Sequence, residues 1–419
     1  MFTFIHTADI HLDSPLRNLS QYEGAPVDAL RGATRRAMEN LVELAVSRDV
    51  DFLLISGDLY DGDWKDYNTG LYLVSQMSRL READIDVCII TGNHDAASKM
   101  TRTIRLPDNV QVFSASAPET IRFDKIGVAV HGQSFSGPAV KKNLASAYPE
   151  TVDGYYNIGM LHTCATGREG HEPYAPCKIE DMVSKGYDYW ALGHVHQREV
   201  LSKDPLIVFP GNIQGRHVKE TGSKGCMLVK ADDSGKAVPE FNALDVLRWQ
   251  KAEIDISDAG DGHQVVENVC GQLETFLEKN DGLPLAARIE LYGRSAVHER
   301  LAARPDHWTN QIRSAALDVG AGRIWIEKVK LLTDLPKENK AIPEGPVGEI
   351  MGYFDELKSD QDLLLSLGKS LDPLIRKLPR EMKEYSQLFQ NADPDRLAQI
   401  LDTVRPVLLD RLMGKGEDL

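Results

Sequence analysis

The chain has 419 residues, of which 42% are hydrophobic and 26% are charged, and this composition is typical of a globular protein rather than a disordered one. Because a single hydrophobic core rarely grows beyond about 250–300 residues, the length predicts at least two folding units. The formal net charge of -15 argues against tight DNA binding through an overall basic face. Binding through divalent cations, a local basic patch or a basic partner stays open.

The cysteine pattern and the hydropathy pattern bear on the compartment. The five cysteines are scattered and form no CxxC pair, so we expect neither disulfides nor a structural zinc site. The first residues lack the basic region of a signal peptide, and no apolar run reaches the roughly 18–20 residues that span a bilayer. We therefore expect a cytoplasmic protein in a reducing environment, without membrane association.

The first part of the chain alternates predicted strands with predicted helices. Such alternation predicts an α/β domain in which apolar strands form sheets covered on both faces. The predicted helices cover Val27–Arg48 and Tyr67–Ala83. The predicted strands lie within Phe2–His11 and over Phe52–Ser56, Val87–Ile90, Val110–Phe113, Ile126–Gly132, Tyr156–Leu161, Tyr189–Leu192, Leu206–Phe209 and Cys226–Lys230.

The composition changes near Leu247, and the rest of the chain predicts a small α+β unit and a helical segment. The small unit has predicted strands over Lys251–Ile256, Ala286–Leu291 and Arg323–Lys330, and predicted helices over His263–Asn280, Ala296–Ala303 and Trp308–Ala316. We expect domains at 1–246 and 247–334, a linker rich in Pro, Lys and Glu at 335–346, and a Leu-rich helical segment at 347–419. This last segment either packs on its own body or docks a partner.

Polar residues stand repeatedly where a predicted strand ends. In α/β sheets, functional groups collect beyond the carboxyl ends of the strands, so these residues are expected at one rim. They are Asp9 and His11 in Asp-x-His, Asp58 after a glycine, Asn93, His94 and Asp95 in Gly-Asn-His-Asp, His162, and His194 and His196 in Gly-His-x-His.

Each of these motifs has an ordinary structural explanation when it is taken alone. Asp-x-His is found in solvated loops, a single aspartate after a strand is often a turn or helix cap, and a lone histidine is often a buried core residue. Together the residues indicate a site for two divalent cations, which needs several N and O donors and one bridging carboxylate. The donor set contains no thiolate and permits manganese, iron or zinc.

The order of these motifs resembles the five sequence signatures of the calcineurin-like metallophosphoesterases. It is most similar to SbcD-type DNA-repair nucleases, and within them to the YhaO-like exonuclease group, through HTADIHLDSPL, GDLYD and PGNIQGRHVKETGSKG. The resemblance covers about residues 1–246. It implies an α/β sandwich of two sheets flanked by helices, followed by a small α+β capping domain and a helical C-terminal segment.

The resemblance also implies a role for each site residue. It places His94 opposite the scissile phosphate and not on a metal ion, with Asp95 orienting His94 or pairing with it. It favours Mn²⁺, and the donor set also permits Fe²⁺ or Zn²⁺. Asp61 stands where some relatives outside the bacterial branch have a histidine, which puts in doubt an exonuclease role for that position. The metal ligands implied are Asp9, His11 and His196 for the first ion, Asn93, His162 and His194 for the second, and Asp58 between them.

The activity implied is hydrolysis of DNA by a hydroxide held between two metal ions, by an exonuclease or endonuclease of DNA repair. Its partners would be DNA, a coiled-coil ATPase similar to SbcC and a second copy of the chain. The dimer would form through helices near Leu30–Arg48 and Tyr67–Arg81, although amphipathic helices that pack on their own sheet have the same pattern. Arg102, Arg216 and Lys219 follow metal-binding motifs and are candidates for phosphate contacts, with solvated surface as the alternative. Two other functions stay open: a calcineurin-like phosphatase or cyclic-nucleotide phosphodiesterase, and a non-catalytic scaffold.

Overall fold

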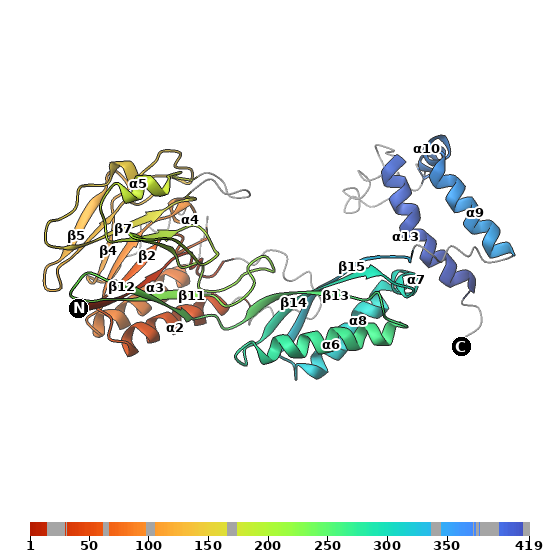
Figure 1. Cartoon of the computed structure of the whole chain (residues 1–419), viewed down its shortest axis with the longest axis horizontal. Coiled ribbons are helices and arrows are strands. Elements are labelled where there is room, and N and C mark those ends of the chain that lie inside the picture. Colours follow the sequence, from red (N-terminus) through yellow and green to blue (C-terminus); the bar gives the residue numbers. More distant parts are fainter. Residues whose placement is uncertain are drawn as a thin grey trace. The chain divides into compact units, whose positions relative to one another are not determined.

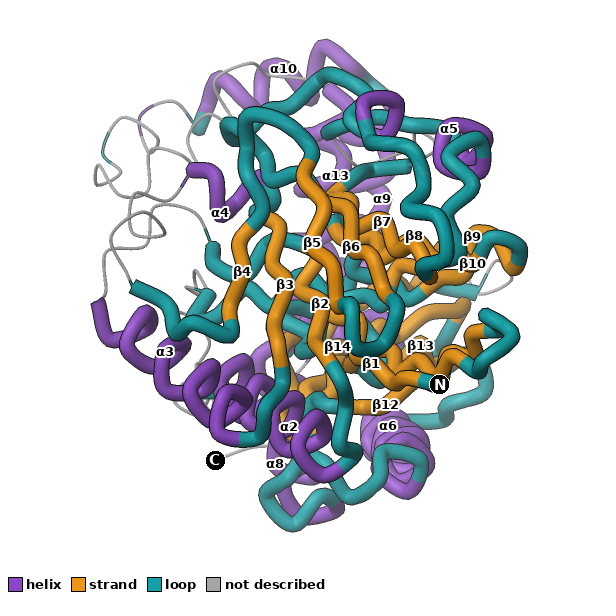
Figure 2. Tube along the Cα trace, turned by 90° about the vertical axis from the view of Figure 1, so that its left-hand side faces the viewer, coloured by secondary structure: helices purple, strands orange, loops and turns teal. Residues whose placement is uncertain are grey.

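Two six-stranded sheets pack face to face in the first part of the chain (Figures 1 and 2). The computed structural model describes residues 1–14, 30, 32–61, 67–97, 105–165, 174–336, 345–371, 373, 377 and 394–413. In order across the first sheet the strands are β12 (Ala237–Ala243), β11 (Gly225–Ala231), β1 (Phe2–Thr7), β2 (Phe52–Ser56), β3 (Asp86–Ile90) and β4 (Val110–Val112). In order across the second they are β5 (Glu119–Phe123), β6 (Val128–Gly132), β7 (Tyr156–His162), β8 (Tyr189–Gly193), β10 (Leu206–Phe209) and β9 (Glu199–Lys203).

The main core lies between the two sheets. Successive side chains of a strand point to opposite faces, so continuously apolar strands such as β2 can feed a core on each side of the sheet. Phe4 and Phe52 face the second sheet and stack with ring centroids 5.1 Å apart. Tyr189 from β8 meets the edge of Phe4 at 5.2 Å. Aromatic packing of this kind fixes the two sheets against each other.

Helices cover the outer face of the first sheet. The helices α2 (Ala33–Ser47) and α3 (Tyr67–Glu82) each bury a stripe at intervals of three and four residues, such as Met38, Leu41 and Val42 of α2. These side chains join Ile5, Leu53 and other residues of the sheet in a second core. Figure 2 shows α2 and α3 on one side of the strands and the short helix α5 (Ile179–Val183) on the other.

The strand directions bring five strand ends to one rim. In the first sheet β1, β2, β3 and β4 are mutually parallel neighbours. In the second, β6, β7, β8 and β10 are parallel neighbours. The predicted site residues lie at the carboxyl ends of β1, β2, β3, β7 and β8, as the sequence predicted. The short helix α4 (Asn93–Ala97), which the sequence did not predict, begins at this rim.

The chain divides into two compact units, Met1–Gln250 with Asn280–Ala287, and Lys251–Lys279 with Arg288–Leu419. The second contains most of a sheet of β13 (Arg248–Asp255), β14 (Leu285–Arg294) and β15 (Ile324–Asp334). Its helices are α6 (Gly262–Glu278), α7 (His298–Ala303), α8 (Pro305–Val319), α9 (Pro346–Ser359), α10 (Gln361–Ser370) and α13 (Pro394–Met413). The predicted domain limits stay a prediction, and 337–344 of the linker lie outside the described residues. None of the described helices is long and apolar enough to span a membrane.

The predicted fold class, mixed α/β with two sheets flanked by helices, is confirmed. The sequence did not predict β5, β9 and β12, which lie at sheet edges. Their residues alternate between partly buried and exposed, and β12 carries Pro239, which edge strands tolerate. The helix predicted over Val27–Arg48 is observed as Ala33–Ser47, and residues 27–29 and 31 lie outside the description.

Candidate metal centre

The loops that follow β1 and β2 lie side by side in an unusual backbone conformation. Asp9, His11 and Asp58 have φ angles of 52°, 46° and 52°, in the left-handed region that non-glycine residues rarely adopt. Two hydrogen bonds, from the N–H of Asp9 to the Gly57 carbonyl and from the N–H of His11 to the Asp58 carbonyl, both 3.0 Å, tie the loops together. Such strain persists only where the surrounding structure imposes it, and it is concentrated at functional sites.

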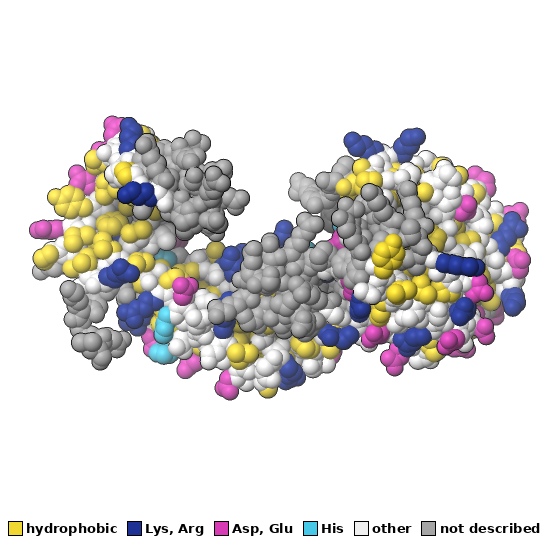
Figure 3. Space-filling model, turned by 180° about the vertical axis from the view of Figure 1, so that it is seen from behind, with side chains coloured by type: hydrophobic (Ala, Val, Ile, Leu, Met, Phe, Trp, Pro, Cys, Tyr) yellow, Lys and Arg dark blue, Asp and Glu magenta, His cyan; other side chains and the backbone are white. Residues whose placement is uncertain are grey.

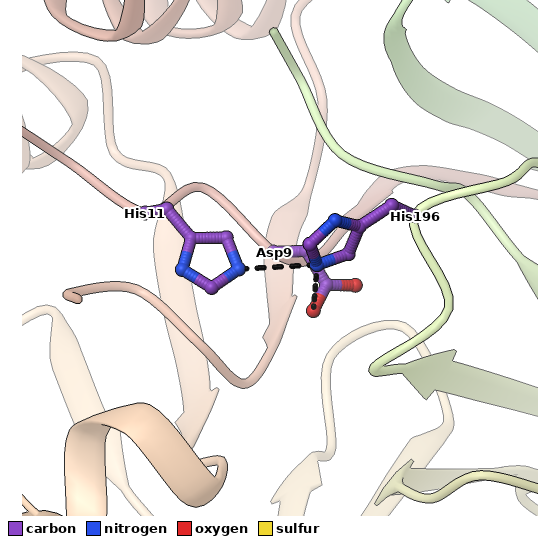
Figure 4. A group of neighbouring side chains, drawn as sticks. All are labelled: Asp9, His11 and His196. Atoms are coloured by element: carbon purple, nitrogen blue, oxygen red, sulfur yellow. Dashed lines mark hydrogen bonds and ion pairs between the residues drawn. The ribbon is translucent and has the colours of Figure 1, made fainter. Parts of the chain in front are cut away.

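Asp9, His11 and His196 converge from the loops after β1 and β8 (Figure 4). His11 Nε2 and His196 Nε2 face each other at 3.2 Å, and His196 Nε2 lies 3.8 Å from Asp9 Oδ1. Asp9 and His11 are buried, and the backbone N–H of His194 donates to both oxygens of Asp9 at 3.1 and 3.0 Å. This is the set predicted for the first ion.

A second group of donors converges beside the first. His162 donates from Nδ1 to the Ser56 carbonyl at 2.9 Å, because a carbonyl can only accept. Its Nε2 therefore carries the lone pair when the ring is neutral, and it faces Asn93 Oδ1 at 3.1 Å and Asp58 Oδ2 at 3.5 Å. His194 completes this group with Asp58 and His162. Three acceptor atoms that meet in a buried place require a proton or a cation between them.

Asp58 lies between the two groups. Its Oδ2 is 3.5 Å from His162 Nε2 and 3.9 Å from His11 Nε2, while its Oδ1 accepts from the backbone N–H of His94 at 2.9 Å. Burial alone would raise the pKa of Asp58, but His162, His11 and His94 together hold it well below its usual range. Burial lowers the pKa of His162, yet the carboxylates of Asp58 and Asp9 outweigh it and raise that pKa to about 9. The site therefore favours positive charge beside an ionised Asp58.

These donors fit two divalent ions. Converging N and O atoms without a thiolate suit manganese, iron or zinc. Asp58 belongs to the second group, and its Oδ2 also lies 3.9 Å from His11 Nε2 of the first. His162 donates the proton on Nδ1 to the Ser56 carbonyl. Metal-binding histidines usually donate from their other ring nitrogen in this way, which fixes their tautomer. In the described residues, the seven donors that the sequence predicted are all brought to this rim, and their assignment to individual ions stays a prediction.

His94 extends from α4 beside the two groups and is partly open to solvent, with a side-chain exposure of 39%. Its Nδ1 lies 2.7 Å from Asp61 Oδ1, and this hydrogen bond is the main cause that raises the pKa of His94. The ring meets the edge of His11 at 4.9 Å. His94 also lies within ligand distance of His11 and Asp58, so proximity alone does not separate a metal ligand from a residue that faces substrate.

Asp95 is buried and supports the backbone of the rim. It accepts hydrogen bonds from the N–H groups of Leu59, Tyr60 and Gly92, at 3.1, 2.7 and 3.0 Å. Burial, assisted by the charge of Asp58, raises the pKa of Asp95 to about 6. The role predicted for Asp95, orienting His94, stays a prediction. The structure shows it joining the loop after β2 to the loop after β3.

The predicted phosphate-binding residues differ in their surroundings. Arg102 lies outside the described residues. Lys219 is exposed in the loop before β11. Arg216 has a side-chain exposure of 14% and lies between two carboxylates, 3.6 Å from Asp61 Oδ2 and 3.5 Å from Glu220 Oε1. The positive charge of Arg216 thus already interacts with the carboxylates of Asp61 and Glu220.

Two carboxylates at the site received no catalytic or positioning role from the sequence. Asp61 stands three residues after Asp58 in the GDLYD turn, so its closeness to the rim was a usable signal. Glu220 lies in an irregular loop, and its contact with His196 at 2.6 Å joins residues 24 apart in sequence. No local pattern marks such a contact, because it depends on the return of the loop to the rim.

Glycines leave room for the donors. A Cβ at Gly193 would lie 1.9 Å from the Ser56 carbonyl oxygen and 3.0 Å from His162 Nδ1. Gly193→Ala is therefore expected to displace the carbonyl that orients His162, lowering stability by about 1–3 kcal/mol as overpacking does and weakening metal binding. Thermal unfolding with and without Mn²⁺ measures both effects.

Gly137→Ala is the matched control, because a Cβ there meets nothing within 4 Å. It should unfold and bind metal as the unaltered chain does. Equal behaviour of the two variants would contradict the steric argument for Gly193.

Comparisons with known proteins agree with this geometry. Residues 2–198 match the family model described as calcineurin-like phosphoesterase, and residues 249–334 match the middle domain of metallophosphoesterase YhaO. A protein of Bacillus subtilis described as uncharacterized metallophosphoesterase YhaO is 39% identical over 419 residues, covering 96% of this chain and 99% of that protein. The DNA double-strand break repair protein Mre11 of Methanopyrus kandleri is 27% identical, over 56% of this chain and 55% of that protein. The Mre11 protein of Sulfolobus acidocaldarius is 26% identical, over 69% of this chain and 74% of that protein.

Proposed function

Since the chain belongs to the calcineurin-like metallophosphoesterases, we propose that it is a two-metal-dependent DNA phosphodiesterase, an exonuclease or endonuclease of DNA repair. Members of this family are hydrolases of phosphate esters that use divalent metals. The proposal adds DNA as the substrate, Mn²⁺ as the preferred ion, the cytoplasm as the location, and an SbcC-like coiled-coil ATPase as the partner. The relatives described as Mre11 support the choice of DNA.

The observation that carries the proposal is the convergence of donors around Asp58, with His94 beside them. When bound, two divalent ions supply positive charge to a phosphate and lower the pKa of water for attack on phosphorus. The seven predicted donors would hold the ions, and Asp61 would orient His94. His94 then stabilises charge on the phosphate or protonates the leaving oxygen.

The charge distribution supports a role for ions and a partner in DNA binding. The net charge is -15, and on the face shown in Figure 3 basic side chains are interspersed with acidic ones. We propose that Arg216 and Lys219, in the loop next to the rim, contact phosphate groups of the DNA. Divalent ions at the rim would supply the remaining attraction for the DNA backbone.

Exposed apolar residues support the proposed protein partners. On the C-terminal helices Tyr353 and Val404 are 64% and 45% exposed. We propose that these helices dock the ATPase, which would cover such side chains. Tyr67 and Leu71, one turn apart on α3, are each 65% exposed, and we propose that α3 contributes to a homodimer.

The test is hydrolysis of end-labelled single- and double-stranded DNA by the purified full-length chain with Mn²⁺. A bis(p-nitrophenyl) phosphate assay and a p-nitrophenyl phosphate assay run beside it. We expect metal-dependent cleavage of DNA and of the bis-ester, with little hydrolysis of the monoester. His94→Gln should lose cleavage of both diesters.

The other outcomes identify the alternatives. Hydrolysis of the monoester or of a cyclic nucleotide without DNA cleavage would replace the nuclease by a phosphatase or cyclic-nucleotide phosphodiesterase. Mn²⁺ binding without hydrolysis of any ester, even with the ATPase added, would leave a non-catalytic scaffold.

A further inference from the structure

Glu220 is a buried carboxylate in the loop between β10 and β11, with 6% of its surface exposed. It belongs neither to the predicted donors nor to the groups that could hold an ion directly. A buried carboxylate is costly unless hydrogen bonds and opposite charges compensate for its lost hydration. The groups that compensate for it show what it does.

Each oxygen of Glu220 has its own set of partners. Oε1 accepts from His196 Nδ1 at 2.6 Å and lies 3.4 Å from His217 Nε2 and 3.5 Å from Arg216 Nη2. Oε2 accepts from the backbone N–H of Arg216 at 2.8 Å and from Asn212 Nδ2 at 3.0 Å. One carboxylate thus connects a predicted metal ligand to the predicted phosphate-binding arginine.

The contact with His196 determines which of its nitrogens can bind a cation. A carboxylate only accepts, so His196 Nδ1 carries the proton, and in the neutral ring Nε2 presents its lone pair. This Nε2 is the atom that faces His11 Nε2 at 3.2 Å and Asp9 Oδ1 at 3.8 Å. His196 is the most exposed of these three residues, so packing restrains its ring the least, and the 2.6 Å contact with Glu220 adds a restraint.

We propose that Glu220 is a positioning residue that sets the tautomer and orientation of His196 and thereby the affinity of the Asp9–His11–His196 position for a divalent ion. The inference deepens the proposed function, because it rests on that metal centre, and it does not depend on DNA as the substrate. Carboxylates hydrogen-bonded to metal-binding histidines change metal affinity by about 10–100-fold when they are replaced. The other position, held by Asp58, His162 and His194, has no contact with Glu220 among the hydrogen bonds and ion pairs described.

Glu220→Gln is the informative variant, because it keeps the size of the side chain. The amide can accept from His196 Nδ1 with its oxygen only by turning its NH2 toward the donors of Arg216 and Asn212. The opposite orientation sets NH2 against His196 Nδ1–H. In either orientation at least one donor loses its acceptor, which the carboxylate avoids.

The experiment measures Mn²⁺ binding to the full-length chain by calorimetry and electron paramagnetic resonance, without substrate. We expect Glu220→Gln to bind one Mn²⁺ about 10–100-fold more weakly and the other with unchanged affinity. At limiting Mn²⁺ the signal of an isolated ion should replace that of a coupled pair. Glu327→Gln is the matched control, since Glu327 is a buried carboxylate paired with Arg288 in the other compact unit.

A second variant separates positioning from general stability. If Glu220 acts through His196, Glu220→Gln should have no further effect on Mn²⁺ affinity in a His196→Ala background. Additive losses in the double variant would overturn the inference, and so would two unchanged affinities in Glu220→Gln. Failure of the chain to cleave DNA would contradict the proposed function and leave this inference standing.

Discussion

Replacing Asp58 by asparagine is expected to lower phosphodiesterase activity and Mn²⁺ affinity by more than about 100-fold, the upper end of the losses seen for residues that only support a ligand. Asp58 is the carboxylate that reaches a histidine of each group, at 3.5 Å from His162 and 3.9 Å from His11. Its low pKa keeps it ionised, so asparagine removes a negative charge from between the two ions. Calorimetric titration with Mn²⁺ and the bis-ester assay measure the two losses.

Asp245→Asn provides the control for loss of a buried carboxylate. Asp245 is buried in the same unit and pairs with Arg248 at 2.9 Å, and none of the hydrogen bonds and ion pairs described joins it to a predicted donor. Its replacement should reduce stability with little effect on Mn²⁺ affinity. If Asp58→Asn still bound both ions tightly, Asp58 would not be the shared ligand.

Replacing His94 by glutamine is expected to lower kcat for the bis-ester by about 10²–10⁴-fold, the usual contribution of a general acid or base. Mn²⁺ affinity should change little, because the seven predicted donors remain. Asp61→Asn should reduce kcat by a smaller factor, since it weakens the 2.7 Å hydrogen bond to His94 Nδ1 without removing the ring. Steady-state kinetics at saturating Mn²⁺, with a parallel Mn²⁺ titration, separates the two effects.

The alternative for His94 gives a different pattern. His94 lies close enough to His11 and Asp58 to act as a ligand. A His94→Gln variant that loses one Mn²⁺ along with its activity would assign the ring to metal binding. The order of the kcat losses is also informative, because an Asp61→Asn effect larger than that of His94→Gln would mean that Asp61 acts through Arg216 or Ser14.

The sequence was most informative where burial is complete. The strands β2, β8 and β10 are buried throughout, β3 is buried except at Asp86, and all four were predicted within one residue at each end. The strands that the sequence did not predict, β5, β9 and β12, lie at the edges of the two sheets, where polar residues are tolerated. Local propensity is weak there, since pairing with a neighbouring strand decides the conformation.

Most residues of the metal centre could also be predicted from the sequence, because they follow the ends of predicted strands. The carboxyl ends of parallel strands lie at the same edge of a sheet, so motifs that follow such strands are expected together. This placement grouped Asp9, Asp58, Asn93, His162 and His194 before the structure was known. Their order and residue types predicted two ions and one shared carboxylate. Membership of the metallophosphoesterase family agrees with that prediction.

The sequence by itself thus determined the α/β class, the rim and the seven candidate donors, because hydrophobic period and strand-end position are local properties of the chain. Only the tertiary structure assigned Asp61 to His94 and Glu220 to His196, and showed Arg216 between these two carboxylates. The Asp61–His94 contact joins residues 33 positions apart, and the Glu220–His196 contact joins residues 24 positions apart. No periodicity encodes them, because each depends on how a loop folds back against a rim that other segments have built.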